Sequence, residues 1–588
     1  VLGFHASNSA AQSTSILAFV SNQFEITMKL FGLLLGLLPL VLAVPAKRDS
    51  APTVAIPSPA ATIIGSTSSS VDSFEGVPFA QPPTGSLRLK PPQALTSLGT
   101  VTATDSPTAC PQLYFGDNLN SSDWPAGVLG TLLNTPLFQN VTNAGEDCLT
   151  VNIYRPAGTT DTSNLPVLFW IFGGAFELGS TQMYNGASLV TNSVTAGKPI
   201  VFVAVNYRLG GFGFLGGSEI LADGSSNLGL LDQRLGMQWV QDNIASFGGD
   251  PTQVTIWGES AGAISVLDHM ILYDGDNTYN GKPLFRAGIM DSGSVIPADP
   301  VDCPKAQNIY DTVVKTAGCS GANSTLDCLR GVDYETFLGA TNSVPSFLSY
   351  TSIELSYLPR PDGKVLTLSP ELLIKNGTYA KVPFIIGDQE DEGTLFSLFQ
   401  SNISTTAELI TYLSTVYFQD ATVDQVTTLV GTYPDDPSDG SPFRTGILNN
   451  WYPQYKRLAA ILGDLTFTLS RRAFLNYTST LASEVPSWSY LASYDYGTPV
   501  LGTFHVGDIL QVFYGILPNY ASASIHSYYL SFVYTMNPNN GSNYTEWPQW
   551  NDGQQLMQFN SGDSALLADD FRPEPYEFLV ANQESLHV

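Results

Sequence analysis

The sequence predicts an α/β protein with a mostly parallel central sheet, and four segments in its middle carry that prediction. Residues 167–172 and 201–205 are continuous apolar runs, as expected of strands that are buried on both faces. Further along, apolar residues recur at the spacing of one helix face, at Leu231, Leu235, Trp239 and Phe247. The β-rich run 254–257 follows, and this alternation is typical of a parallel sheet with crossover helices.

The amino-acid composition argues against several classes of protein. Of the 588 residues, 43% are hydrophobic and only 13% are charged, which excludes a disordered chain or a coiled coil. The net charge of −28 repels polyanions, so nucleic acid is not an expected partner. The five cysteines form no C-x-x-C pair and lie near no histidine cluster, so no metal site is expected.

The first fifty residues carry the pattern of an export signal. Met28 and Lys29 precede an apolar run at 30–44, which is followed by small residues and the dibasic pair Lys47-Arg48. The run is short for a membrane span and contains Pro39, so a signal peptide is favoured over a membrane anchor or a buried helix. Residues 28–48 are therefore predicted to be a signal peptide with a processing site, and the protein to be secreted.

Residues 1–27 precede that signal and contain no starting methionine, so they are interpreted as upstream sequence outside the folded protein. The remainder, residues 49–588, contains eight N-x-S/T sequons, which in an exported protein lie on surface loops. These candidate glycosylation sites are Asn120, Asn140, Asn323, Asn376, Asn402, Asn476, Asn540 and Asn543.

Residues 258–262 read G-E-S-A-G and fit the G-x-S-x-G pattern of a nucleophilic serine. The pattern alone is weak, and an ordinary serine in a tight glycine turn would also produce it. Here it follows a predicted strand and precedes small, helix-compatible residues, as a strained strand-to-helix turn requires. The context therefore identifies Ser260 as the candidate nucleophile.

A serine nucleophile needs a histidine base, and the chain offers few. His5 lies before the export signal and His587 is the penultimate residue. His269 falls on the same predicted helix as the serine, and His526 lies in a helical-looking stretch, so both favour structural roles. His505 lies in a loop bounded by glycines and is the predicted base.

The acid that orients the base is expected in residues 387–394, which follow the apolar strand 382–386 and contain several carboxylates. Spacing alone does not choose among them. The order serine, acid, histidine is that of α/β-hydrolases. A glycine-rich turn at 173–176 follows the first apolar strand and suits an oxyanion hole, to which the N–H of Ala261 would also contribute.

At these residues and at further motifs along the chain, the sequence resembles the type-B carboxylesterase and lipase family, the cholinesterase-like branch of the α/β-hydrolases. Within that family its pattern looks most like that of secreted fungal lipases and sterol esterases. The motifs that carry this resemblance span residues 76–83, 146–152, 206–208, 227–233 and 247–251. The resemblance implies one domain over residues 49–588, with a large, mostly parallel sheet, flanking helices and a lid-like disulfide loop.

The same resemblance assigns roles to individual residues. The acid of the family's D-E-G pattern falls on Glu392, and the base falls on His505. The oxyanion donors fall on the N–H groups of Gly174, Ala175 and Ala261, although many members have glycine where Ala175 stands. A supporting serine near the acid corresponds to Ser292, and the pocket walls are expected to include Phe176, Leu395 and Phe396.

The resemblance also implies a covalent framework. It pairs Cys110 with Cys148 and Cys319 with Cys328, leaves Cys303 unpaired, and implies a buried ion pair between Arg88 and Glu146. In fungal relatives the loop closed by the first disulfide carries a lid. A moving lid and a fixed covering loop remain equally open here, and the apolar residues of that loop are Trp124, Val128, Leu129, Leu132, Leu133, Leu137 and Phe138.

Together these features predict a secreted serine hydrolase of apolar carboxylic esters that works through an acyl-enzyme, without a cofactor or a metal. Its expected partners are a small-molecule or lipid ester and, transiently, a lipid interface. The fold also hosts catalytically inactive adhesion modules, which is the alternative function, but those usually lack a member of the triad. Acyl length, the alcohol, the pH optimum and the oligomeric state stay undetermined by the sequence.

Overall fold

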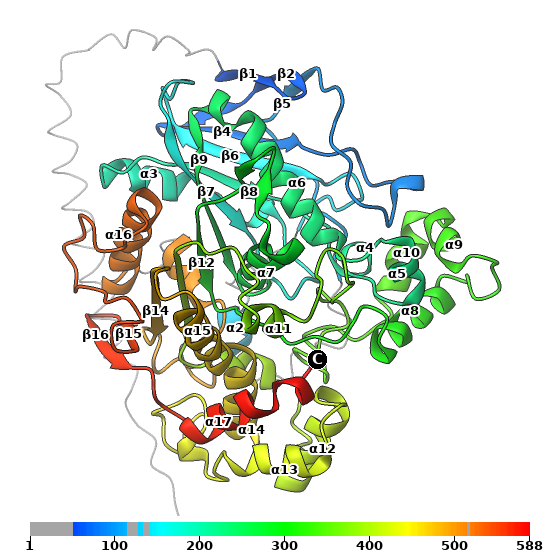
Figure 1. The fold of residues 1–588 in the computed structure, drawn as a ribbon, viewed down its shortest axis with the longest axis vertical. Coiled ribbons are helices and arrows are strands. Elements are labelled where there is room, and N and C mark those ends of the chain that lie inside the picture. Colours follow the sequence, from blue (N-terminus) through cyan, green and yellow to red (C-terminus); the bar gives the residue numbers. More distant parts are fainter. Residues whose placement is uncertain (1–50, 114–127, 133–140, 514–517) are drawn as a thin grey trace, which may run out of the picture. The chain divides into compact units, whose positions relative to one another are not determined.

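A computed structural model describes residues 51–113, 128–132, 141–513 and 518–588 (Figure 1). The predicted signal peptide and the sequons at Asn120 and Asn140 lie outside these residues. So does most of the predicted lid, of which Val128 and Leu132 are described as buried residues of helix α2 (Val128–Leu132). No helix in the described ranges is long and apolar enough to cross a membrane.

The central sheet has eleven strands among the described residues, in the order β16-β15-β14-β13-β12-β9-β7-β8-β6-β4-β3. In this order, every pairing from β15 to β8 is parallel. The pairing β16–β15 at one edge and the pairings β8–β6, β6–β4 and β4–β3 at the other edge are antiparallel. This is the mostly parallel sheet of an α/β-hydrolase. Its strands are β3 (Ser66–Ser68), β4 (Val71–Pro78), β6 (Thr150–Pro156), β7 (Leu165–Ile171), β8 (Val201–Val205), β9 (Gly249–Glu259), β12 (Ala287–Asp291), β13 (Phe384–Gln389), β14 (Ser487–Ala492), β15 (Gln555–Phe559) and β16 (Ser564–Ala568).

Helices connect and cover these strands (Figure 1). They are α3 (Ala187–Thr195), α4 (Gly210–Gly213), α5 (Ser218–Asp223), α6 (Leu228–Asn243), α7 (Ala261–Gly275), α8 (Pro304–Thr316), α9 (Thr325–Gly331), α10 (Tyr334–Thr341), α11 (Pro370–Lys375), α12 (Thr406–Tyr412), α13 (Val423–Gly431), α14 (Tyr455–Gly463), α15 (Leu469–Leu481), α16 (Tyr520–Thr535) and α17 (Pro573–Asn582). Two small sheets, β1 (Thr53–Pro57) with β2 (Ala60–Ile64) and β5 (Thr100–Thr102), and β10 (Thr278–Tyr279) with β11 (Lys282–Pro283), lie apart from the central one.

The central strands read as continuous apolar runs because helices cover both faces of the sheet. Every residue of β8 is buried, as are all residues of β7 except Leu165. Strand β13 extends beyond the predicted apolar run to Gln389, so part of the acidic segment belongs to the strand itself. The predicted strands are therefore present, and their carboxyl ends all face the same side.

The predicted apolar face of helix α6 is confirmed in part. Trp239 and Phe247 are buried, whereas Leu231 and Leu235 are only partly buried and the neighbouring Asp232 is fully buried. The Arg208 side chain makes the burial of Asp232 possible, since its Nε and Nη2 donate to the carboxylate at 2.8 and 2.7 Å. Apolar periodicity cannot indicate a buried carboxylate that is paired in this way.

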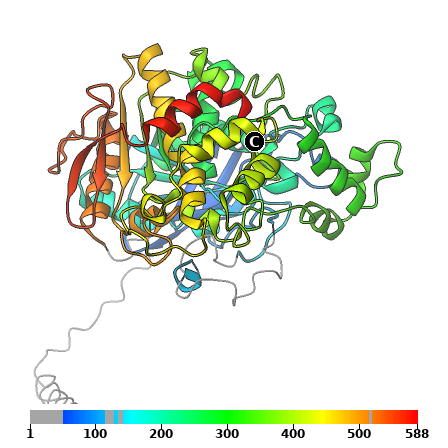
Figure 2. The same cartoon turned by 90° about the horizontal axis from the view of Figure 1, so that it is seen from below.

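A layer of helices lies over the carboxyl ends of the strands. Seen from below in Figure 2, the yellow helices α12, α13 and α14 and the red helix α17 lie in front of the sheet. Their side chains form a second apolar cluster, separate from the core around the sheet and drawn largely from residues between Phe347 and Leu586. The boundary between the sheet and this helical layer is where the candidate site lies.

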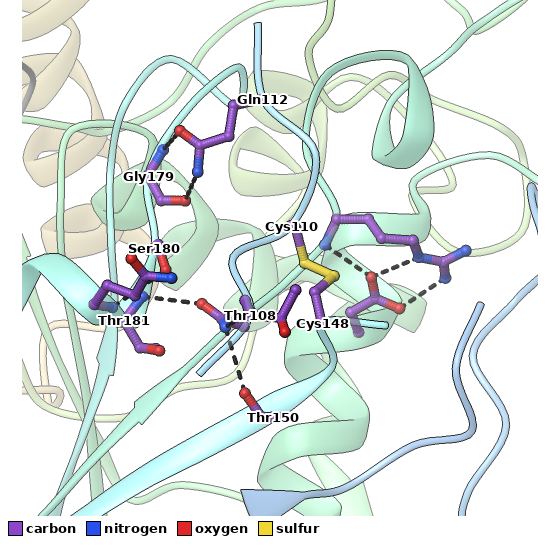
Figure 3. The surroundings of a disulfide bond; sticks show 12 residues. Thr108, Cys110, Gln112, Cys148, Thr150, Gly179, Ser180 and Thr181 are labelled. Carbon is purple, nitrogen blue, oxygen red and sulfur yellow. Dashed lines mark hydrogen bonds and ion pairs between the residues drawn. A yellow bond between two sulfur atoms is a disulfide. The ribbon is translucent and has the colours of Figure 1, made fainter. Parts of the chain in front are cut away.

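Both disulfides implied by the resemblance are present, as Cys110–Cys148 (Figure 3) and Cys319–Cys328. Cys303 is a buried thiol. The described sequon residues Asn323, Asn376, Asn402, Asn540 and Asn543 are exposed. Asn476 is half-buried, and its amide donates to the Tyr576 hydroxyl at 2.6 Å, which makes it the least accessible of the described sequons.

Candidate active site

The carboxyl ends of three strands bring three predicted residues together. Ser260 connects β9 to α7 with φ 57° and ψ −126°, a strained conformation for a serine. The flanking glycines permit this turn, because a Cβ on Gly262 would lie 2.0 Å from the carbonyl oxygen of Ile171. Glu392 begins a short 3-10 helix after β13, and His505 lies in the loop after β14.

These side chains form a continuous hydrogen-bonded relay. The Ser260 hydroxyl donates to Nε2 of His505 at 2.8 Å, and Nδ1–H of His505 donates to Oε2 of Glu392 at 2.5 Å. The second carboxylate oxygen of Glu392 accepts from the backbone N–H of Gln389 at 2.7 Å. The rings of Phe396 and Phe467 pack against the imidazole at 4.9 and 4.8 Å, so its orientation is fixed by packing as well as by hydrogen bonds.

The other carboxylates of the acidic segment point elsewhere. Asp388 accepts from Nε of Arg471 at 2.8 Å. Asp391 accepts from the Ser441 hydroxyl and from the backbone N–H groups of residues 443 and 503. Glu390 forms an ion pair with the half-exposed Arg444. Each of these carboxylates is thus occupied, and Glu392 is the one that reaches the histidine.

The glycine-rich turn after β7 has backbone N–H groups available for an anion. Gly174 and Ala175 have φ values of 111° and 58°, and the Gly174 carbonyl accepts from the N–H groups of Glu177 and Leu178. In the described part of the chain, no hydrogen bond uses the N–H of Gly174, Ala175 or Ala261. All three residues line the same pocket as Ser260. The turn therefore presents donors toward a charge that develops beside the serine.

Contacts around the first disulfide hold the segment that follows this turn (Figure 3). Beside Cys110, the Gln112 amide donates to the Gly179 carbonyl at 2.6 Å and its oxygen accepts from the Gly179 N–H at 3.3 Å. Beside Cys148, Glu146 accepts from Nε and Nη2 of Arg88 at 2.6 and 2.8 Å, the ion pair that the resemblance implies. The disulfide thus joins two segments that are each fixed to the surrounding structure.

A mainly apolar pocket lies beside Ser260 and reaches residues of α7, α14, α15 and α17. Phe176 and Phe396 line it, as the resemblance implies. Leu395 does not line it, because successive residues of the 3-10 helix point in different directions and Leu395 is fully buried in the second apolar cluster. Further lining residues are Ile264, Asp268, Ile296, Pro297, Phe347, Leu358, Tyr417, Phe418, Leu462, Leu465, Phe467, Leu579, Leu586 and Val588.

Residues 586–588 close part of this pocket, beside α11 (Figure 1). Leu586 and Val588 line the wall, and His587 between them points away. Its Nδ1 lies 3.0 Å from Asp299 and its Nε2 lies 3.0 Å from Glu371. These two carboxylates raise the pKa of His587 to about 9, against the opposing effect of burial. The histidine is therefore a charged anchor for the pocket wall.

Comparison with known proteins agrees with this geometry. The profile of the Carboxylesterase family matches residues 50–578. The chain belongs to the carboxylesterase family. It is 65% identical over 545 residues to Secreted lipase 1 of Botryotinia fuckeliana, which covers 92% of this chain and 95% of that protein. It is 57% identical over 554 residues to Secreted triacylglycerol lipase LIP1 of Gibberella zeae, with 94% of each chain covered.

Solved structures agree as well. The crystal structure of Aspergillus niger EstA superposes with a TM-score of 0.75 at 27% identity, covering 92% of this chain and 100% of that one. Members of the carboxylesterase family hydrolyse carboxylic esters, and this chain is such a hydrolase. Within the described ranges, no group of three or more histidine, cysteine or acidic side chains is placed to hold a metal ion.

Two carboxylates beside the relay of this carboxylesterase were missed by the sequence analysis. Oε1 of Glu259 lies 3.5 Å from Nε2 of His505. Burial raises the pKa values of Glu259 and Asp508, and nearby carboxylates raise both further. Burial among other carboxylates therefore favours the neutral forms of these two acids. Glu259 stands inside the G-E-S-A-G motif, and its position next to the nucleophile was the available signal.

Ser292 follows β12 with φ 55°, and its hydroxyl has no hydrogen-bond partner among the described residues. The structure thus gives it no contact with the acid. The preceding Asp291 is more directly involved, because its carbonyl accepts from the Ser260 N–H at 2.9 Å. Its carboxylate accepts from Trp257, at 2.7 Å, and from two tyrosine hydroxyls. This network fixes the backbone under the nucleophile.

The remaining candidate histidines of this carboxylesterase lie away from the relay. His269 is fully buried on α7, where Nε2 lies 2.9 Å from Oε1 of Gln233, and burial lowers its pKa to about 3. His526 lies on α16 and contacts the carbonyl of Val512. Both have the structural surroundings that the sequence suggested.

Proposed function

We propose that the enzyme hydrolyses long-chain acylglycerols through a serine acyl-enzyme, with Ser260 as nucleophile, His505 as base and Glu392 as the orienting acid. The observation that carries this proposal is that Ser260 and His505 of the relay line a pocket whose other walls are mainly apolar. Relatives of 65% and 57% identity bear the names secreted lipase and secreted triacylglycerol lipase, which supports the same substrate class.

In the acylation step, the Ser260 oxygen attacks the ester carbonyl carbon while its proton passes to Nε2 of His505. The carbonyl oxygen becomes an oxyanion beside the N–H groups of Gly174, Ala175 and Ala261. The imidazolium then gives its proton to the leaving alkoxide, and the acyl group stays on Ser260. Because the donors are already oriented, they stabilise the transition state without reorganisation.

In the deacylation step, water takes the place of the alcohol. His505 removes a proton from this water, whose oxygen attacks the acyl carbonyl carbon. The bond from that carbon to the Ser260 oxygen then breaks, the imidazolium returns its proton to that oxygen, and the fatty acid is released. Glu392 stabilises the imidazolium through its hydrogen bond with Nδ1–H. Burial raises the pKa values of Glu259 and Asp508, which favours their neutral forms beside the relay.

Export is part of the proposal. The apolar run 30–44, the dibasic pair at 47–48 and the two disulfides all suit an oxidising, extracellular location. Sequencing of the secreted protein is expected to give a new N-terminus near residue 49. A glycosidase is expected to lower its apparent mass through the exposed sequons. A secreted chain that retains residues 28–48 would contradict this.

The decisive test of the chemistry is Ser260→Ala. Hydrolysis of p-nitrophenyl esters is expected to fall by roughly 10⁴-fold to 10⁶-fold, with unchanged circular dichroism and melting temperature. Wild-type protein is expected to become covalently labelled by a fluorophosphonate, and the variant to remain unlabelled. Retained turnover in the variant would exclude the mechanism. A folded wild-type protein that takes up no label would instead favour an inactive binding module.

The substrate class needs a separate measurement. We expect kcat/KM to rise from butanoyl to octadecanoyl esters. Each added methylene that is buried in the pocket contributes about 0.8 kcal/mol of favourable transfer free energy. Emulsified triacylglycerols should therefore be hydrolysed, and a rate that jumps at the oil–water interface would identify a moving lid. A preference for butanoyl esters, with no hydrolysis of emulsions, would indicate a simple carboxylesterase.

A further inference from the structure

The pocket follows one face of α7 away from the nucleophile. Ser260, Ala261, Ile264 and Asp268 all line it, at the spacing of successive turns of one helix face. With a rise of about 1.5 Å per residue, Asp268 lies roughly 12 Å further along the helix than Ser260. The deep part of the pocket therefore contains an acidic side chain where an acyl tail is expected to lie.

Asp268 is nearly fully buried and lacks the contacts that normally accompany a buried acid. It is 1% exposed, and its Oδ2 has no hydrogen-bond partner within the described residues. Burial raises its pKa to about 8, without a contribution from any charged neighbour. Its carboxyl group is thus neutral below that pH, and it carries both a hydrogen-bond donor and an acceptor.

Two other buried polar groups have partners that the protein itself supplies, whereas Oδ2 of Asp268 has none among the described residues. On the adjacent helix α6, Asp232 is fully buried but bound by Arg208. In the same pocket wall, the Ser470 hydroxyl donates to the Leu465 carbonyl at 2.5 Å. Leaving a buried polar atom unpaired costs free energy, so such a group generally has a partner that the protein itself does not supply.

The surroundings of Asp268 restrict what this partner is. The deep pocket is lined mainly by apolar side chains, including those of Ile296, Pro297 and Leu586. A ligand in this space must be hydrocarbon along most of its length and carry a polar group at one point. A hydroxyl group matches a neutral carboxyl, because each supplies one donor and accepts one hydrogen bond.

The geometry points to a subsite in which Asp268 binds a hydroxyl group on the middle of the acyl chain, so that the enzyme prefers esters of mid-chain hydroxy fatty acids. With C–C bonds of about 1.5 Å and tetrahedral angles, an extended chain advances about 1.25 Å per carbon. The distance along α7 therefore corresponds to about the tenth carbon. This inference rests on the proposed function, since it requires the acyl chain to occupy this pocket.

The test compares p-nitrophenyl esters of 10-hydroxyoctadecanoic and octadecanoic acid in the wild type, Asp268→Asn and Asp268→Leu. Rates are divided by the concentration of active sites counted with a fluorophosphonate. The wild type is expected to have the higher kcat/KM for the hydroxy ester. Asp268→Leu should lower the ratio of hydroxy to plain ester by roughly tenfold, and Asp268→Asn should keep it within about twofold.

The 2-hydroxyoctadecanoyl ester is the matched control, because its hydroxyl lies beside the reacting carbonyl and cannot reach Asp268. Its ratio to the plain ester is expected to be the same in all three proteins. Equal 10-hydroxy ratios in the wild type and Asp268→Leu would overturn the inference and leave Asp268 as a group solvated by water. A wild type that hydrolyses none of the esters would instead refute the proposed function.

A second measurement needs no variant and covers the case in which Asp268→Leu fails to fold. Free 10-hydroxyoctadecanoic and octadecanoic acids are compared as inhibitors of butanoyl ester hydrolysis by the wild-type enzyme. The hydroxy acid is expected to inhibit at a concentration several-fold lower. Equal inhibition, or weaker inhibition by the hydroxy acid, would overturn the subsite.

Discussion

The proposed catalytic relay and the proposed acyl pocket share a border but are built from different parts of the chain. Ser260, Glu392 and His505 each follow a strand of the central sheet, and their hydrogen bonds connect to backbone groups nearby. The pocket wall combines one face of α7 with residues from several connecting segments, from α14, α15 and α17, and with Leu586 and Val588. In the proposed mechanism the chemistry therefore lies at the strand ends, whereas substrate selection depends on the mainly apolar side chains of this wall.

This difference predicts how each region tolerates change. The sheet side depends on single polar atoms at fixed positions, so small substitutions there should have large effects. The pocket wall depends on its shape and its apolar area. Single substitutions there should therefore shift the preference among substrates by smaller factors. Four experiments follow from this contrast.

The largest effect is expected from Glu392→Gln. The amide keeps the size of the side chain but cannot stabilise the imidazolium, so kcat should fall by roughly 10³-fold to 10⁴-fold with little change in melting temperature. Glu390→Gln is the matched control, because Glu390 pairs with Arg444 away from the relay. Its kcat is expected to stay within about twofold of the wild type. Equal losses in both variants would refute the assignment of the acid.

A second comparison places one methyl group beside the relay and one on a helix outside both regions. On Gly173 a Cβ would lie 2.4 Å from the carbonyl oxygen of Glu259, so Gly173→Ala should destabilise the fold by about 1–3 kcal/mol. On Gly339, within helix α10, a Cβ would meet nothing within 4 Å. Gly339→Ala should therefore stabilise the protein by about 0.5–1 kcal/mol. Urea denaturation measures both, and similar stabilities would contradict the packing described.

A smaller effect is expected from His587→Ala, which removes the anchor between Leu586 and Val588. A looser wall fits a long acyl chain less closely, so kcat/KM for octadecanoyl esters should fall by roughly tenfold relative to butanoyl esters. A tenfold change corresponds to a loss of about 1.4 kcal/mol of binding free energy. Thr316→Ala, at the surface of α8, is a suitable control. An unchanged ratio of long to short esters in His587→Ala would show that the wall does not depend on this histidine.

The smallest effect is a pH dependence of stability. Burial raises the pKa of Glu177 to about 8 and that of Asp391 to about 7, so the folded protein keeps these protons after the unfolded chain has lost them near pH 4. Stability from these groups falls as the pH rises from about 4 to 8. His587, with a pKa of about 9, contributes fully below pH 6.5 and loses its contribution as the pH approaches 9.

The melting temperature is therefore expected to be a few degrees higher at pH 5 than at pH 8. A change of about 1 kcal/mol in the free energy of unfolding shifts the melting temperature by several degrees. Scanning calorimetry at constant ionic strength measures this. Glu177→Gln should reduce the slope, because the amide is neutral in both the folded and unfolded states. A protein more stable at pH 8 than at pH 5 would show that these acids are ionised in the folded state.

The sequence analysis worked well for the sheet side and poorly for the pocket. Continuous apolar runs and the G-E-S-A-G motif are local signals, and they predicted the strands and the elbow around Ser260. The acid was ambiguous, because the partners that occupy Asp388 and Asp391 are distant in sequence. Only the family resemblance selected Glu392.

The pocket has no comparable local signal. Phe396 lines it and Leu395 does not, although the two are adjacent and both apolar. Which one faces the cavity depends on the packing of α14 against the 3-10 helix, far away in sequence. Asp268 was not noticed for the same reason, because its position in an apolar wall is visible only when helices from several parts of the chain come together.

The hydrogen bond from Ser260 to His505 joins residues 245 positions apart, and that from His505 to Glu392 spans 113. Contacts of such long range form late in folding, because much of the chain must be ordered before they can close. A nascent or partly folded chain therefore has no assembled nucleophile. Hydrolytic activity is therefore expected to be the last property to return when the denatured protein is refolded.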